Sequence, residues 1–182
     1  MVKGVVRTRV GYAGGTKKDP TYHSLGGHAE TIQIDFDPSV ISYDELLGMF
    51  WKMHSPRMRA PSAQYRSIVF YHNDNQRQAA ERLKADEGAR MKAAIFTEVV
   101  PFTEFYRAED YHQKYYLRDV RELAAEYLAI YPDIADFVGS TATARVNGYA
   151  SHYGTKEQLE KELNSLGLSE ESQRRLLKIV GS

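Results

Sequence analysis

Short stretches of alternating hydrophobic and polar residues occupy the first half of the chain, and they predict β-strands. Residues 31–36 alternate strictly, so one face of this strand is expected to be buried. Residues 5–10 are β-branched residues alternating with arginine, and they lead to a glycine turn at residues 14–15. Two further strands are predicted at residues 67–71 and 97–100.

Helices are predicted between these strands, because capping residues precede runs with helical spacing. Residues 42–45 read Ser-Tyr-Asp-Glu, a capping box that predicts a helix to about His54. This helix is expected to bury Leu46, Leu47, Phe50 and Trp51. Asn73 is expected to cap a polar helix that runs to about Met91, and another helix is predicted near residues 110–117.

From about Asp119 the pattern becomes helical throughout. Apolar residues keep three- and four-residue spacing at Leu123, Tyr127, Leu128, Tyr131, Leu159, Leu163, Leu166, Leu176, Leu177 and Val180. Residues 155–158 form a second capping box, and Gly167 is expected to end a helix. We therefore predict a domain over residues 1–118 and a helical C-terminal extension over residues 119–182, packed on that domain.

The order strand, strand, helix, strand, helix, strand predicts an α+β fold. The expected architecture is a ferredoxin-like α/β sandwich, with an antiparallel or mixed sheet that carries helices on one face. At 182 residues, the chain is long enough for one well-buried domain with a short appendage.

Composition narrows the classes of function. The chain is 42% hydrophobic and 26% charged with zero net charge, which argues against broad binding of nucleic acid or an anionic membrane. No apolar run approaches the ~20 residues of a membrane span, and no signal peptide is recognisable, so a cytoplasmic location is expected. The chain contains no cysteine, which excludes disulfides, thiolate metal sites and thiol catalysis by these residues alone.

Rival chemistries have weak support. Residues 28–30 have the His-x-Glu form of zinc deaminases, but the cysteine-containing partner motif of those enzymes is missing. The six histidines show no metal-ligand spacing that we would defend. We therefore predict no metal and no bound cofactor.

Three polar segments together carry a set of residues typical of an active site. Gly-Tyr-Ala-Gly-Gly at residues 11–15 runs on to Pro-Thr-Tyr at 20–22 and Gly-His-Ala-Glu at 27–30. Gln-Tyr-Arg-Ser follows at 64–67, and Phe-Tyr-Arg-Ala-Glu-Asp-Tyr-His-Gln at 105–113. In this order the motifs resemble those of the type A peptide methionine sulfoxide reductases.

The resemblance implies a reductase of the S epimer of methionine sulfoxide, free or in an oxidised protein or peptide, with a thioredoxin-like thiol as external reductant. It places an acid at Glu30 and two phenols at Tyr22 and Tyr65 around the sulfoxide oxygen. This assignment suits the chemistry, because a carboxylic acid kept neutral by burial can protonate that oxygen while hydroxyl groups share it. We expect such a buried carboxyl where the second strand opens.

The same motifs supply residues expected to support the pocket: His28, Gln64, Asp110 and His112. For His28 we expect a structural role, in which its hydrogen bonds hold the glycine turn. Asp110 and His112 fit either a helix cap or a pocket-orienting role. The simplest alternative for Glu30 is an ordinary ion pair with Arg66 or Lys18.

The chain also departs from the family pattern. The family's Gly-Cys-Phe-Trp motif, which supplies the nucleophile, lies upstream of the Arg-Val-Gly-Tyr stretch, and Ala60 stands where an aspartate is usual. We expect little or no turnover by these residues alone. Three hypotheses stay open: a reductase whose start is placed too late at Met1, a non-catalytic module that binds methionine sulfoxide or a protein, and a scaffold acting through its helical tail. A monomer is expected.

Overall fold

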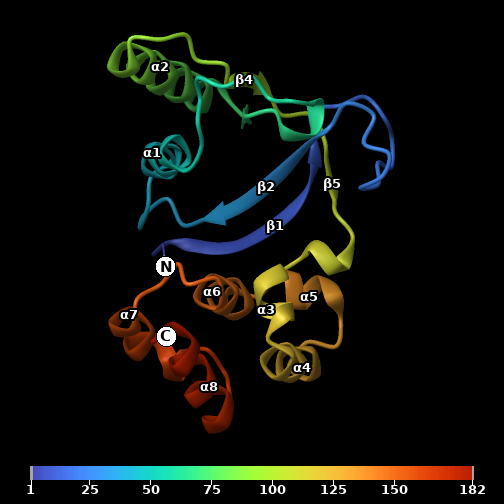
Figure 1. Cartoon of the computed structure of the whole chain (residues 1–182), viewed down its shortest axis with the longest axis vertical. Helices are drawn as coiled ribbons and strands as arrows, with labels where there is room; N and C mark the ends of the chain where they lie inside the picture. Colours follow the sequence, from blue (N-terminus) through green and yellow to red (C-terminus); the bar gives the residue numbers. More distant parts are fainter. Residues whose placement is uncertain (1, 182) are drawn as a thin grey trace. The chain divides into compact units, whose positions relative to one another are not determined.

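The computed structural model describes residues 2–181, and its strands form two small sheets (Figure 1). The first has the order β2-β1-β5, with β1 at Val5–Ala13, β2 at Ala29–Phe36 and β5 at Phe105–Arg107. The second pairs β3 (Ile68–Tyr71) in parallel with β4 (Glu98–Pro101). Within residues 2–181, no helix has both the length and the apolar character that a membrane crossing requires.

Strand β1 continues three residues past the predicted end at residue 10. Gly11, Tyr12 and Ala13 pair antiparallel with β5, with Tyr12 opposite Tyr106. A side chain at position 11 would place its Cβ 2.2 Å from the Tyr106 carbonyl oxygen, so only glycine fits this close approach. The sequence prediction missed β5, because three residues carry too little alternation to identify a strand.

The two central helices begin where their capping residues predict. Ser42 and Glu45 form the predicted capping box at the start of α1 (Tyr43–Met53). Asn73 accepts a hydrogen bond from the backbone of Gln76 and caps α2 (Asp74–Met91). The two helices pack on each other, and α2 packs on both parallel strands, around a core of Leu47, Trp51, Val69 and Ala80.

The remaining helices form a helical group, seen together in Figure 1. They are α3 (Tyr115–Asp119), α4 (Arg121–Ile130), α5 (Ile134–Gly139), α6 (Thr141–Ala150), α7 (Lys156–Glu162) and α8 (Glu170–Val180). Three short 3-10 helices complete the structure at Ala63–Tyr65, Asp110–His112 and Leu163–Ser165. Thr155 and Gln158 form the second predicted capping box, at the start of α7.

The helical group has its own apolar core. Its buried members are Leu117, Leu123, Tyr127, Phe137, Val138, Val146, Tyr149, Leu159, Leu166, Leu168 and Leu176. Each fully buried side chain of this size stabilises the fold by about 1.5–3 kcal/mol. The Tyr127 hydroxyl, buried with its ring, donates a hydrogen bond to the Leu166 carbonyl at 2.7 Å. This bond avoids the free-energy cost of burying a hydroxyl without a partner.

The structure thus confirms the α+β class. Its contacts divide the chain into two compact units. The first, which we call the helical unit, contains the residues up to Arg9, the segment Gln33–Phe36 and the residues from Glu109 onward. The other contains Val10–Ile32 and Asp37–Ala108. The predicted boundary between residues 118 and 119 stays a prediction.

A lysine is buried in the helical unit. Lys114 has a left-handed backbone conformation (φ 53°), and its Nζ donates hydrogen bonds to the Thr8 carbonyl at 2.7 Å and the Thr8 Oγ1 at 3.1 Å. Burial, with a smaller contribution from the nearby Arg9 cation, lowers the pKa of Lys114 to about 8. Burying the protonated Lys114 side chain away from water therefore costs free energy.

This burial predicts a pH-dependent stability. An unfolded lysine titrates near pH 10.4, so between pH 8 and pH 10 the unfolded state holds a proton that folded Lys114 releases. The free energy of unfolding should therefore rise with pH across this window, by roughly 1.4 kcal/mol per pH unit at most. In the Lys114→Met protein, the free energy of unfolding should not show this increase between pH 8 and pH 10. Urea unfolding at several pH values measures it, and equal pH slopes for both proteins would contradict the assignment.

Candidate functional site

The glycine turn that leads into β2 is organised by the buried ring of His28. Its Nδ1 accepts a hydrogen bond from the Gly15 backbone at 3.1 Å, and its Nε2 lies 2.9 Å from the Lys17 carbonyl oxygen. Because a carbonyl only accepts, Nε2 carries the proton and Nδ1 does not. The ring also meets Tyr106 edge-on, with centroids 5.4 Å apart. These contacts hold the glycine turn, and the support of a substrate pocket by His28 stays a prediction.

Gly15 is required by this packing. A Cβ at position 15 would lie 2.3 Å from the His28 backbone nitrogen and 2.5 Å from a carbon of its ring. Real Cβ atoms do not approach so closely, so a larger residue must displace the His28 ring or the turn. The turn and the start of β2 are therefore one tightly fitted piece of structure.

Arg66 connects the glycine turn to the Gln-Tyr-Arg-Ser motif at residues 64–67. Its guanidinium donates to the Gly27 carbonyl at 2.9 Å and pairs with the Glu98 carboxylate at 3.2 Å. Its Nε also reaches the Ala63 carbonyl, at 3.4 Å. A single side chain thus links the residues before β2, the 3-10 helix Ala63–Tyr65 and strand β4, which only a planar multi-donor group can do.

The Glu30 carboxylate meets the same motif directly. Gln64 Nε2 donates a hydrogen bond to Glu30 Oε1 at 2.8 Å, joining residues 34 positions apart in the chain. The predicted alternative for Glu30 is an ion pair with Arg66 or Lys18. Arg66 pairs with Glu98, and the ion pair with Lys18 stays a prediction. The structure therefore brings Glu30 and Gln64 together and holds the backbone on both sides of them.

The expectation that Glu30 is buried is wrong. Along β2, Ala29 is buried whereas Glu30 is exposed, and Ile32, which shares the Glu30 face, is 57% exposed. The strand alternation turns this face away from the core, which leaves Glu30 exposed. Any desolvation of Glu30 therefore has to come from what binds beside it.

One of the two predicted phenols lies in a 3-10 helix and the other in a tight turn. Tyr65 follows Gln64 in the 3-10 helix and is 55% exposed, so its hydroxyl is accessible. Tyr22 lies within the tight turn closed by hydrogen bonds between Thr21 and Ser24, and its ring packs edge-on against His23. Their convergence with Glu30 on one ligand stays a prediction.

The last two predicted residues fall elsewhere in the chain. Asp110 and His112 form the ends of the 3-10 helix Asp110–His112, in the helical unit. The His112 ring packs on Tyr111 with centroids 4.2 Å apart. Their support of a substrate pocket stays a prediction.

The His28 ring also lines a polar hollow of about 300 Å³. Its lining includes Lys17, Lys18, Glu104 and Tyr106. The Tyr106 hydroxyl donates to Glu104 at 2.6 Å, and this hydrogen bond raises the pKa of Tyr106 to about 12. Sequence reasoning took this tyrosine only as part of a motif, and its packing against His28 was not visible from spacing.

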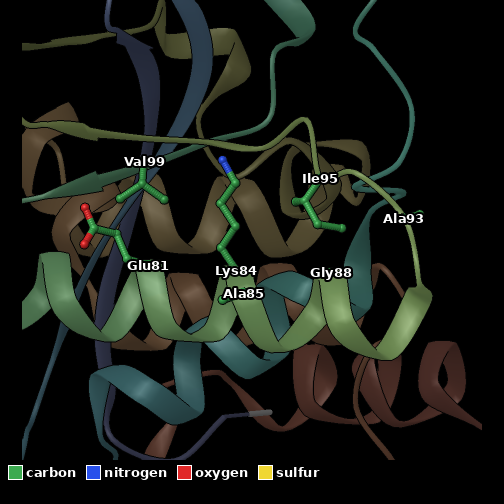
Figure 2. Close-up of a pocket in the computed structure, with 7 residues that line it drawn as sticks. All are labelled: Glu81, Lys84, Ala85, Gly88, Ala93, Ile95 and Val99. Carbon is green, nitrogen blue, oxygen red and sulfur yellow. The ribbon is translucent and has the colours of Figure 1, made fainter.

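A larger hollow of about 460 Å³ runs along α2, as Figure 2 shows. Its lining is both polar and apolar, with Glu81 and Lys84 beside Ala85, Gly88, Ala93, Ile95 and Val99. None of the motif residues lines it, so its size does not make it the reactive site. Within residues 2–181, no group of three or more histidine, aspartate or glutamate side chains is placed to hold a metal ion.

Comparisons with known proteins agree on one family. The family model described as peptide methionine sulfoxide reductase matches residues 1–142. A peptide methionine sulfoxide reductase of Drosophila melanogaster is 40% identical over 169 residues, covering 92% of this chain and 68% of the fly protein. One from Methanosarcina acetivorans is 47% identical over 127 residues, covering 64% of this chain and 68% of that protein.

Solved structures give the same result. The reduced form of Mxr1 from Saccharomyces cerevisiae matches with a TM-score of 0.58 and 29% identity, over 65% of this chain and 74% of that one. Methionine sulfoxide reductase A of Corynebacterium diphtheriae matches with a TM-score of 0.55 and 31% identity, over 64% of each chain.

The close approach at Gly15 gives a test of the turn. Gly15→Ala should lower the free energy of unfolding by about 1–3 kcal/mol, because the new methyl group overlaps His28. Gly48→Ala is the matched control: a Cβ there meets nothing within 4 Å, and alanine in helix α1 should stabilise by up to about 1 kcal/mol. Urea unfolding compares them, and a Gly15→Ala protein as stable as the parent would refute the fit.

Proposed function

The chain belongs to the peptide methionine sulfoxide reductase family, and on that premise we propose that Tyr22, Glu30 and Tyr65 bind and polarise the oxygen of methionine sulfoxide. The observation that carries the proposal is the hydrogen bond from Gln64 to Glu30. It joins the two motifs that hold the acid and one phenol. The substrate is the S epimer, free or within an oxidised protein or peptide.

The contacts around Glu30 support its role as the acid. Gln64 occupies one carboxyl oxygen, which leaves the second for a ligand. Arg66 and the buried His28 fix the backbone just before Glu30, so the carboxyl is held in place before substrate arrives. The methyl and methylene groups of a bound methionine sulfoxide then supply apolar cover for the exposed carboxyl, and desolvation favours a protonated carboxyl.

The reaction needs an electrophilic sulfur. A protonated carboxyl and a phenol both donate to the sulfoxide oxygen, which withdraws electrons from the sulfur. A thiolate then attacks the sulfur, the sulfur–oxygen bond breaks, and the oxygen leaves as water with two protons. A second thiol releases the thioether while the two thiols become a disulfide. One sulfoxide and two thiols thus give one thioether, one disulfide and one water.

These residues supply only part of that chemistry. None of the 182 residues is a cysteine, so both thiols must be supplied from outside them. We propose no bound cofactor, and a thioredoxin-like protein or a small dithiol as the reductant that regenerates an attacking thiol which these 182 residues do not contain. The contribution of the chain is recognition and polarisation of the sulfoxide.

Calorimetric titration with a peptide containing methionine-S-sulfoxide tests the binding role. The parent chain should bind at millimolar concentration or better, and Glu30→Ala and Tyr65→Phe should each weaken binding about tenfold, the loss of one hydrogen bond worth about 1.4 kcal/mol. Tyr153→Phe, at a tyrosine 72% exposed in the helical unit, should change nothing. A parent chain that gives no heat at millimolar peptide would end the proposal.

A turnover assay tests the division of labour. With dithiothreitol or thioredoxin as reductant, the cysteine-free chain should form methionine no faster than the reductant alone, because no enzyme thiolate is positioned at the sulfur. Liquid chromatography of the product measures this rate. Robust turnover that disappears in Glu30→Ala would show that an external thiol is sufficient and would contradict the expectation.

A further inference from the structure

Two methionines are strongly exposed in one short segment. Met53 is 73% exposed and Met58 is 71% exposed, whereas Met49 is 38% exposed and Met91 is only partly exposed. Methionine is usually an interior residue, so two thioethers in water within six residues are unusual. Neither belongs to the motifs assigned to the candidate site.

We propose that Met53 and Met58 form an oxidation site, whose sulfoxides are themselves substrates of the reaction class of this family. The thioether sulfur attacks the outer oxygen of a hydroperoxide, the oxygen–oxygen bond breaks, and the remaining oxygen leaves as water or alcohol. Sulfur loses two electrons and the peroxide gains them. The inference rests on family membership, not on the roles proposed for Glu30 and Tyr65.

The backbone of this segment is anchored, so the side chains protrude from a fixed scaffold. The His54 ring bonds the Phe50 carbonyl at 2.8 Å and the Thr97 hydroxyl at 2.9 Å. The Phe96 backbone donates to the Pro56 carbonyl at 2.8 Å. Neither anchor uses a methionine side chain, so a polar sulfoxide at position 53 or 58 costs no core packing.

Geometry also makes the sulfoxides accessible to a reductase. Met53 is the last residue of α1, and Met58 lies in the turn where its own N–H donates to the Ser55 carbonyl at 3.1 Å. Both side chains therefore project from a helix end and a loop, where another protein's concave pocket can reach them. Met49, one turn back within the helix, is less exposed and less accessible.

Timed exposure to hydrogen peroxide, followed by peptide mass spectrometry, tests the oxidation site. Met53 and Met58 should each gain one oxygen several-fold faster than Met91, with the far-ultraviolet circular dichroism unchanged. Glu30→Ala should oxidise identically, which separates this result from the binding proposal. Equal rates at all three methionines, or Met91 reacting first, would overturn the inference.

Repair is tested on the oxidised protein. A cysteine-containing type A reductase with dithiothreitol should remove about half of the oxygen added at positions 53 and 58, because such enzymes act on one sulfoxide epimer. Met53→Leu and Met58→Leu should each lose the corresponding oxidised and repaired species while keeping the fold. Retention of all the oxygen at both positions, while a free sulfoxide peptide is repaired, would overturn the substrate assignment.

Discussion

The candidate site depends on one constraint, the fixed backbone between Gly15 and Glu30. The His28 ring fills the space that a side chain at position 15 would need, and its two nitrogens bond the turn on either side. Arg66 then holds the Gly27 carbonyl from outside. Because a side chain is positioned only as well as its backbone, the meeting of Glu30 with Gln64 follows from these contacts.

The arrangement explains how an exposed carboxylate can still be specific. Hydrogen bonding orients Glu30, whose side chain is exposed. Orientation and desolvation are separate requirements of an acid catalyst, and the chain meets the first. A sulfoxide bound against this face of β2 would supply the desolvation, so substrate binding would also activate the acid.

The sequence predicted features that depend on local chemistry. The capping boxes at Ser42 and Thr155 rest on neighbouring residues, and both helices begin there. The family motifs could likewise be read without coordinates. Strand β5, the route of Arg66 to Glu98 and the burial of Lys114 depend on partners far along the chain. The exposure of Glu30 was missed for the same reason, since a strand pattern does not say what covers each face.

Nuclear magnetic resonance measures the central claim most directly, because it locates a ligand residue by residue. On titration with a methionine sulfoxide peptide, backbone amide shifts should concentrate at residues 22, 28–32 and 64–66, and the unoxidised methionine peptide should leave them in place. Shifts confined to the α2 hollow or to the helical unit, or equal shifts with the unoxidised peptide, would contradict the account.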